Sequence, residues 1–301
     1  MATAVIRDVL HTYDWTGQNM SPSHNDNDDE ELPTLVFIHG WLLSRSYWQP
    51  VIEELSQFYP CLTYDLRGFG ESKALHHQSH DYPEQQFTLD EYSEDLKSLL
   101  THLGIKKAWL VGHSLGGSIA LWTASKLSKV VEGVVCVNAG GGIYLKEDFE
   151  KFRSAGQQII KNRFPWLLYV PFIDLPFTRL MVHKPLARRW GRQRIKDFFA
   201  ADRKAALGAL LETTTEKEVH QLPQLVAQLR QPVHFLAGSQ DSVMELKYVY
   251  HLASFHYSFG SRGENVTEIE RCGHLAMVEH AGTVSQNLLD ILSKNTCKKS
   301  L

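Results

Sequence analysis

The sequence has little of several features that would each point to a particular class of protein. Its 301 residues contain only four cysteines, at positions 61, 136, 272 and 297, and their spacing matches neither a disulfide framework nor a metal site. A net charge of −3 gives no reason to expect a nucleic-acid partner. No apolar run reaches the length of a membrane span, and the first residues lack the apolar core of a signal peptide. We therefore expect a cytoplasmic protein of a reducing compartment, with no metal.

What the chain does have is a regular alternation of short apolar runs and helical patterns. The runs predict buried strands, at residues 35–38, 61–65, 108–111, 133–137, 233–236 and 266–269. Residues 4–15 alternate more loosely and predict one edge strand. This order of elements predicts an α/β fold with a mostly parallel central sheet flanked by helices. Functional loops are then expected at the carboxyl ends of the strands.

The most informative stretch is residues 108–124, where an apolar strand meets a Gly-x-Ser-x-Gly sequence and continues with helical spacing. Ser114 therefore stands at a sharp bend between a strand and a helix. Gly112 and Gly116 suit this bend because a Cβ at either position would crowd the neighbouring backbone. The helix that begins after Ser114 presents unpaired N–H groups, which favour negative charge beside the serine. This context predicts a nucleophilic serine.

A nucleophilic serine needs a base within hydrogen-bond reach and an acid that orients the base. His274 follows the last predicted strand and a glycine, and Asp241 follows the strand before it. Both are therefore expected at the same end of the sheet as Ser114. Each alone would mean little, because the chain has 15 histidines and an aspartate after a strand can also cap a helix. Together they predict a Ser-His-Asp triad.

Acyl transfer also needs donors aimed at the oxyanion of the tetrahedral intermediate. The backbone N–H of Leu115, at the helix start, is the first predicted donor. The N–H of Trp41, after His39 and Gly40, is the second, since a glycine lets this loop turn close to the serine; an ordinary tight turn is the alternative. We interpret His113 as a structural or pocket-lining residue rather than a second base. His39, Gly40 and His113 are expected at substrate-binding positions.

Strand signals stop after residue 142, and the sequence up to residue 225 is helical and aromatic. We interpret residues 143–225 as an inserted helical cap on a core of residues 1–142 and 226–301. Within it, residues 164–177 are mostly aromatic or aliphatic, and residues 179–196 hold seven Lys or Arg residues and no acid. The cap is expected to line the active site with its basic residues in solvent. A patch that contacts anionic lipid surfaces is the alternative.

These motifs resemble the α/β-hydrolase fold superfamily, and specifically its branch of capped esterases, lipases and C–C hydrolases. The resemblance rests on the triad order and on residues 39–41, 65–72, 112–117, 238–241 and 273–274. It implies that residues 65–72 form a structural loop near the site. Epoxide hydrolases and dehalogenases of this fold carry an aspartate where this chain has Ser114, so an alkyl-enzyme mechanism is not expected. The resemblance specifies the substrate only weakly, with lipid and prenyl-ester hydrolases among the candidates.

We therefore expect a serine hydrolase of carboxylic esters with a hydrophobic acyl or alcohol group, working without a cofactor. The expected partner is a small hydrophobic ester, with peripheral membrane contact through the cap as an addition; the oligomeric state is not indicated. A C–C bond hydrolase or lyase, a perhydrolase and a ligand receptor with little turnover are the alternatives. Arg188 and Arg189 would contribute to binding only if the substrate were acidic.

Overall fold

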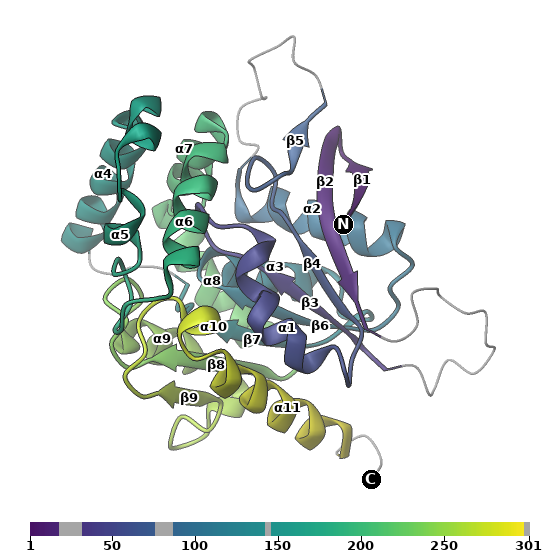
Figure 1. Cartoon of the computed structure of the whole chain (residues 1–301). Coiled ribbons are helices and arrows are strands. Elements are labelled where there is room, and N and C mark those ends of the chain that lie inside the picture. Colours follow the sequence, from purple (N-terminus) through teal and green to yellow (C-terminus); the bar gives the residue numbers. More distant parts are fainter. Residues whose placement is uncertain (18–31, 76–86, 142–145, 298–301) are drawn as a thin grey trace.

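The computed structural model describes residues 1–17, 32–75, 87–141 and 146–297. A nine-stranded sheet forms the centre of the molecule (Figure 1), in the order β1-β2-β4-β3-β6-β7-β8-β9 with β5 paired to β2. The strands from β4 to β9 along this path pair in parallel, which confirms the predicted sheet. Their bounds are β1 Ala2–Ile6, β2 Val9–Thr16, β3 Thr34–Ile38, β4 Cys61–Tyr64, β5 Lys73–Ala74, β6 Ala108–His113, β7 Val131–Val137, β8 Val233–Gly238 and β9 Val266–Ile269.

The N-terminal end differs from the single edge strand predicted over residues 4–15. β1 and β2 form an antiparallel hairpin instead, and β2 pairs antiparallel with β4. The chain reverses at Arg7 and Asp8, whose φ angles are 49° and 63°. This left-handed conformation is most common at glycine, so the sequence carries no strong turn signal at the reversal.

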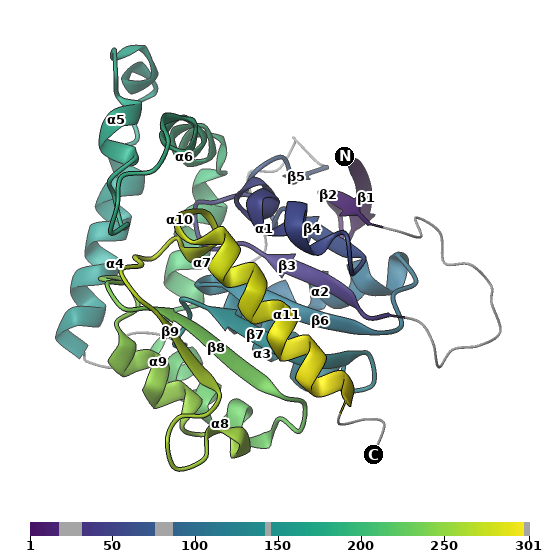
Figure 2. The ribbon, with the colours of Figure 1, turned by 60° about the horizontal axis from the view of Figure 1, so that its bottom comes forward.

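Helices cover both faces of the sheet. The helical elements are η1 Arg45–Trp48, α1 Gln49–Leu55, α2 Leu89–His102, α3 Leu115–Lys126, α4 Lys146–Lys161, η2 Pro165–Tyr169, α5 Asp174–Phe177, α6 Arg188–Ala200, α7 Arg203–Glu212, α8 Glu216–Gln228, α9 Leu246–Ala253, η3 Tyr257–Phe259, α10 Ala276–Glu279 and α11 Ala281–Cys297. Helices α2, α3, α8 and α9 pack on one face, and α1 and α11 on the other (Figures 1 and 2). Among the described residues, no helix is long and apolar enough to cross a bilayer.

Two apolar cores result, because successive side chains of a strand point to opposite faces. In β3, Val36 and Ile38 belong to the core under α2 and α3, whereas Leu35 and Phe37 belong to the core under α1 and α11. The strands β6 and β7 alternate in the same way. Both faces of each central strand are therefore buried, which explains why these strands read as unbroken apolar runs.

Between β7 and β8 the described residues hold only helical elements, from α4 to α8. Of the predicted cap, residues 143–145 lie outside the described residues. The predicted boundary at residues 225 and 226 falls inside α8, whose residues Leu222 and Val226 are buried in the core with α3 and α9. Helix α8 therefore packs as part of the core, and we use the name helical insertion for α4 to α7. Figure 2 shows α4, α5 and α6 projecting on the side away from the C-terminus.

Candidate active site

Ser114 occupies the bend between β6 and α3, as the sequence predicts. Its backbone angles are φ 51° and ψ −119°, a strained conformation for a residue with a side chain. A Cβ at position 112 would lie 2.2 Å from the carbonyl oxygen of Gly116, and one at position 116 would lie 2.3 Å from that of Ile38. Only glycine therefore lets the strand, the bend and the neighbouring strand β3 approach this closely. The bend places Ser114 at the carboxyl end of β6 and the N-terminus of α3.

Asp241 and His274 meet at the same end of the sheet. His274 Nδ1 lies 2.8 Å from Asp241 Oδ2. The other carboxylate oxygen, Oδ1, accepts hydrogen bonds from the backbone N–H groups of Val243 and Met244, at 2.8 and 2.9 Å. Burial by itself would raise the pKa of Asp241, but the charge of His274 and the hydrogen bonds to the carboxylate outweigh it and lower the pKa. The arrangement holds an ionised carboxylate against a fixed imidazole nitrogen.

Asn138, which the sequence analysis did not single out, completes this arrangement. Its side-chain Nδ2 donates to Asp241 Oδ2 at 2.8 Å and to the carbonyl oxygen of Gly273 at 3.0 Å. It thereby links the end of β7 to the loops that carry Asp241 and His274. The feature of the sequence that could have identified Asn138 is its position as a polar residue directly after a buried strand. Asn138 is fully buried and has φ 49°, a conformation that asparagine tolerates better than most residues.

Ser114 follows His113, which contacts His274, but among the described residues no hydrogen bond joins Ser114 to His274. The ring of His113, the residue before Ser114, lies 4.8 Å from the ring of His274, centroid to centroid. His274 is 3% exposed, so little water reaches it. Serine–histidine hydrogen bonds are often long in ligand-free enzymes and tighten when substrate binds.

His113 is neutral and holds the loop of the proposed base. Its Nε2 lies 2.7 Å from the carbonyl oxygen of His274, so this nitrogen carries the hydrogen and donates it. Burial, followed by the charge of His274, lowers the pKa of His113 to about 3. A group with this pKa binds no proton near neutral pH and does not compete with His274 as a base. This agrees with the interpretation of His113 as a structural residue.

The loop after β3 carries the second predicted oxyanion donor. Among the described hydrogen bonds, neither the backbone N–H of Trp41 nor that of Leu115 has an acceptor. A Cβ at position 40 would lie 2.8 Å from His113 Nδ1 and 3.2 Å from Ser114 Cβ, so Gly40 lets this loop approach both residues. The indole Nε1–H of Trp41 donates to the carbonyl oxygen of Ala206 in α7, at 2.8 Å. The same residue thus connects the proposed oxyanion site to the helical insertion.

His39 ties this loop to the end of β4. Its Nδ1–H donates to the carbonyl oxygen of Gly40 at 2.8 Å, and its Nε2 accepts from the backbone N–H of Leu66 at 2.9 Å. The side chain is fully buried, and burial lowers its pKa. None of the three residues predicted to bind substrate, His39, Gly40 and His113, is among those that line the pocket beside Ser114. Their observed contacts shape the backbone around the serine, and their contact with substrate stays a prediction.

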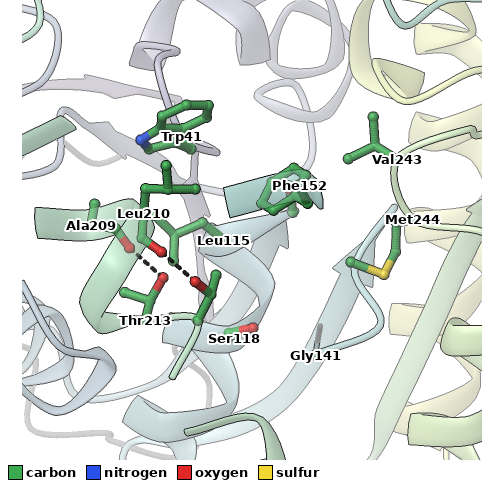
Figure 3. A pocket seen from close by; sticks show the side chains of 12 residues that line it. Trp41, Leu115, Ser118, Gly141, Phe152, Ala209, Leu210, Thr213, Val243 and Met244 are labelled. Carbon is green, nitrogen blue, oxygen red and sulfur yellow. Dashed lines mark hydrogen bonds between the residues drawn. The ribbon is translucent and has the colours of Figure 1, made fainter. Parts of the chain in front are cut away.

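The pocket beside Ser114 is mostly apolar, and none of the described residues that line it has a charged side chain (Figure 3). Thr213 Oγ1 donates to the carbonyl oxygen of Ala209 at 2.6 Å, and Thr214 Oγ1 donates to that of Leu210, so both hydroxyls are used within the insertion. The described residues contain no cluster of side chains suited to a metal ion. The lining comprises Trp41, Ser114, Leu115, Ser118, Gly141, Phe152, Ala209, Leu210, Thr213, Thr214, Val243 and Met244.

A buried carboxyl joins the insertion to the loop that carries Trp41. Asp197 of α6 accepts a hydrogen bond from Ser44 Oγ at 3.0 Å, and its other oxygen lies 3.0 Å from Gln193 Nε2. Burial raises the pKa of Asp197 to about 6, although the hydrogen bonds from Gln193 and Ser44 lower it in part. The protonated form of Asp197 is therefore favoured more strongly in the folded protein than in the unfolded chain.

The Asp197 carboxyl predicts a pH dependence of stability. Its folded-state pKa of about 6 exceeds the reference value of 3.8, so its contribution is fully present below pH 3.8 and is lost as the pH rises through 6. We expect the free energy of unfolding of the wild type to fall by about 3 kcal/mol relative to Asp197→Asn across this window. Urea unfolding of both proteins at several pH values measures this difference. If the free energies of unfolding of the two proteins changed with pH in parallel, the interpretation of Asp197 as a buried carboxyl with a raised pKa would be contradicted.

Comparisons with known proteins identify the family of this fold. A family model described as alpha/beta hydrolase fold matches residues 33–281. Pimeloyl-acyl-carrier-protein methyl ester esterase of Pseudoalteromonas atlantica is 22% identical over 274 residues, which cover 88% of this chain and 95% of that protein. The 2-succinyl-6-hydroxy-2,4-cyclohexadiene-1-carboxylate synthase of Enterobacter is 28% identical over 87% of this chain and 92% of its own length. Protein PHYLLO of Arabidopsis thaliana is 31% identical over 44% of this chain, a match that spans only 8% of that protein.

Solved structures share the same fold at low sequence identity. A thermophilic esterase from Thermogutta terrifontis superposes with a TM-score of 0.71 and 20% identity, over 98% of each chain. A protein from Acinetobacter baumannii described as a putative lipase superposes with a TM-score of 0.75 and 21% identity, over 99% of this chain and 92% of that one. With a family model that matches most of its length and a serine bend at the carboxyl edge of a parallel sheet, the chain belongs to the α/β hydrolase fold family.

Proposed function

We propose that this protein is a serine hydrolase that cleaves carboxylic esters with a hydrophobic acyl or alcohol group. The observation that carries the proposal is the pocket next to Ser114, which is mostly apolar and has no charged side chain among its described lining residues. Burying an unpaired carboxylate or ammonium group there would be unfavourable, whereas an alkyl group gains from leaving water. The hydrogen-bonded pair of Asp241 and His274 supports hydrolytic chemistry at the same place.

In the proposed mechanism, Ser114 Oγ attacks the ester carbonyl carbon while His274 Nε2 accepts the hydroxyl proton. Asp241 accepts the Nδ1–H of His274, which fixes the tautomer with a free Nε2 and stabilises the imidazolium ion that forms. The negative oxygen of the tetrahedral intermediate accepts hydrogen bonds from the N–H groups of Trp41 and Leu115. His274 then returns the proton to the leaving alcohol.

Water completes the reaction. It attacks the acyl-enzyme carbonyl as His274 takes one of its protons, and the second tetrahedral intermediate collapses to release the carboxylic acid and restore Ser114. The lowered pKa of Asp241 supports this sequence, because an ionised carboxylate must face the imidazolium in both halves. No step requires a metal or an organic cofactor.

The C–C hydrolase alternative has less support from the geometry. Its expected substrates are small acids, which would need a cation close to Ser114. Arg188, one of the two expected carboxylate ligands, is paired with Asp174, with Nε 2.5 Å from Oδ2, and its guanidinium lies over the ring of Phe172. Neither Arg188 nor Arg189 lines the pocket beside the serine. We therefore expect Arg188→Ala and Arg189→Ala to leave the cleavage of a neutral ester unchanged.

A panel of p-nitrophenyl esters from acetate to palmitate tests the proposal. We expect turnover that peaks at medium or long acyl chains and falls about 10⁶-fold in Ser114→Ala. The p-nitrophenyl monoester of a dicarboxylic acid, matched in length to a preferred neutral ester, serves as the charged control. It should be cleaved much more slowly, because its carboxylate would lose hydration in an uncharged pocket.

Three results would count against the proposed function. Absence of turnover on every ester, with a protein that unfolds cooperatively, would favour the C–C hydrolase or the receptor. Preference for the charged ester would place a cation within reach of the acyl group and would favour an acidic substrate. Release of p-nitrophenol that persists in Ser114→Ala would remove Ser114 from the mechanism.

A further inference from the structure

The segment after α4 exposes an unusual number of large apolar side chains. Residues 164–180 contain seven of the fifteen most exposed large apolar side chains among the described residues. Tyr169 is 86% exposed, Phe172 64% and Trp166 60%. Clusters of this kind are uncommon on the free surface of a protein and indicate a contact surface. We call the seven residues the apolar ridge: Phe164, Trp166, Leu168, Tyr169, Phe172, Leu175 and Leu180.

The local structure explains why the ridge is not buried. Its two helical elements, η2 and α5, are only five and four residues long, and prolines at positions 165, 171 and 176 interrupt the segment. Such short elements cannot form a continuous apolar stripe that packs on a neighbour along its length. Figure 2 shows α5 at the outer end of the insertion, with α6 between it and the rest of the molecule.

Basic side chains border the ridge. Residues 163–196 contain eight Lys or Arg residues and a single acid, Asp174, in a chain whose net charge is −3. On α6, Arg189, Arg192 and Lys196 follow a spacing of three and four residues, which places them on one helix face. All three are exposed. We call these three residues the basic face of α6.

Helix α6 and the apolar ridge are in direct contact. The guanidinium carbon of Arg188 lies 5.3 Å from the ring centroid of Phe172. A hollow in the surface is lined by Leu168 and Phe172 from the ridge together with Arg192 and Lys196 from α6. Asp174, at the edge of the same hollow, pairs with Arg188 and Arg192, so it neutralises only part of the positive charge.

We propose that the apolar ridge and the basic face of α6 dock this protein on the surface of an anionic phospholipid bilayer. Tryptophan and tyrosine side chains suit the boundary between headgroups and acyl chains, and lysine and arginine are attracted to anionic headgroups. A second copy of the chain is a poorer occupant, because a symmetric contact through this face would bring the same positive charges together. The proposal goes beyond the ester hydrolysis proposed above and does not depend on it.

Docking in this orientation would bring the insertion, which also supplies Phe152, Ala209 and Leu210 to the pocket beside Ser114, close to the bilayer. A hydrophobic ester dissolved in the membrane would then have a short path to the serine. Binding to the bilayer is nevertheless a separate property, and a protein without any esterase activity can be tested for it.

Co-sedimentation with vesicles tests the proposal directly. The wild-type chain is mixed with vesicles of phosphatidylcholine alone or of phosphatidylcholine with phosphatidylglycerol. Two double variants change the apolar ridge and the basic face separately. The first is Trp166→Ser with Tyr169→Ser, and the second is Arg189→Glu with Lys196→Glu. Two matched controls change exposed residues elsewhere: Phe58→Ser with Tyr257→Ser, and Arg262→Glu with Lys294→Glu. Thermal unfolding of each variant checks that it is folded.

We expect the wild type and both controls to sediment with the anionic vesicles and not with phosphatidylcholine alone. Each ridge or charge variant should lower the partition coefficient by about tenfold or more, and added salt should weaken binding of the wild type. Binding that is absent, or that the ridge and charge variants leave unchanged, would overturn the proposal. A concentration-dependent dimer in sedimentation equilibrium that these variants abolish would assign the face to a second copy instead.

Discussion

Replacing Asp241 by asparagine is expected to lower kcat about 10⁴-fold on the preferred ester while the protein stays folded. The backbone N–H groups of Val243 and Met244 both donate to one carboxylate oxygen, so the asparagine oxygen will take that place. Its NH₂ group then faces His274 Nδ1, which must become the acceptor. The proton moves to Nε2, and the imidazole can no longer accept the proton of Ser114.

Asn138 increases this effect. Its side-chain NH₂ donates to the same carboxylate oxygen, so in the Asp241→Asn variant two NH₂ groups would face each other. Turning the Asn138 amide relieves that conflict but removes the donor to the carbonyl oxygen of Gly273. Steady-state kinetics of the variant, beside Ser114→Ala as the baseline, measures the loss. A variant within tenfold of the wild type would show that Asp241 does not orient the base.

The second large effect is expected at Gly116, where a single methyl group should lower the free energy of unfolding by about 3 to 5 kcal/mol. A Cβ at this position would lie 2.3 Å from the carbonyl oxygen of Ile38 and 2.7 Å from that of His39. Both atoms belong to the backbone of β3 and the loop after it, and they cannot move unless the sheet opens between β3 and β6. Urea unfolding of Gly116→Ala measures the loss.

Two other glycines provide matched controls for that substitution. In α11, a Cβ at Gly282 would have its nearest neighbour, Glu54 Oε1, at 3.6 Å, so Gly282→Ala should be neutral or stabilise the protein by up to about 1 kcal/mol. Gly104 has open space around it and φ +67°, so Gly104→Ala isolates the cost of the left-handed conformation, about 1 kcal/mol. If Gly116→Ala lowers the free energy of unfolding no more than Gly104→Ala does, the close approach of the bend to β3 is not the reason that position 116 needs a glycine.

The parts of the molecule that follow local rules were predictable from the sequence. Apolar runs of strand length between helical patterns predict a parallel sheet because both faces of such strands are buried. The glycines around Ser114 predict a tight bend for the steric reason that the structure now shows. Asp241 and His274 were predicted at one edge of the sheet because each follows a strand, and the structure brings them within hydrogen-bond distance.

The parts that depend on distant contacts were not predictable in the same way. The partners of Asn138 come from loops 103 and 135 residues further along the chain, and no local pattern records that pairing. His39 and His113 were expected at substrate-binding positions, which stays a prediction; the backbone hydrogen bonds that each makes join parts of the chain that only the fold brings together. The predicted end of the insertion falls inside α8, because this helix has the periodicity of any amphipathic helix, whichever layer it packs on.

The position of the helical insertion bears on how such a protein can evolve. β7 ends at Val137 and β8 begins at Val233, yet these strands are neighbours in the sheet. The entropy lost in closing a loop grows with the logarithm of its length, at roughly 0.6 kcal/mol per doubling. The helices of the insertion can thus be lengthened or replaced with little penalty to the sheet. Because they form one wall of the pocket while Ser114 stands at the end of β6, substrate range can diverge over generations without disturbing the proposed catalytic residues.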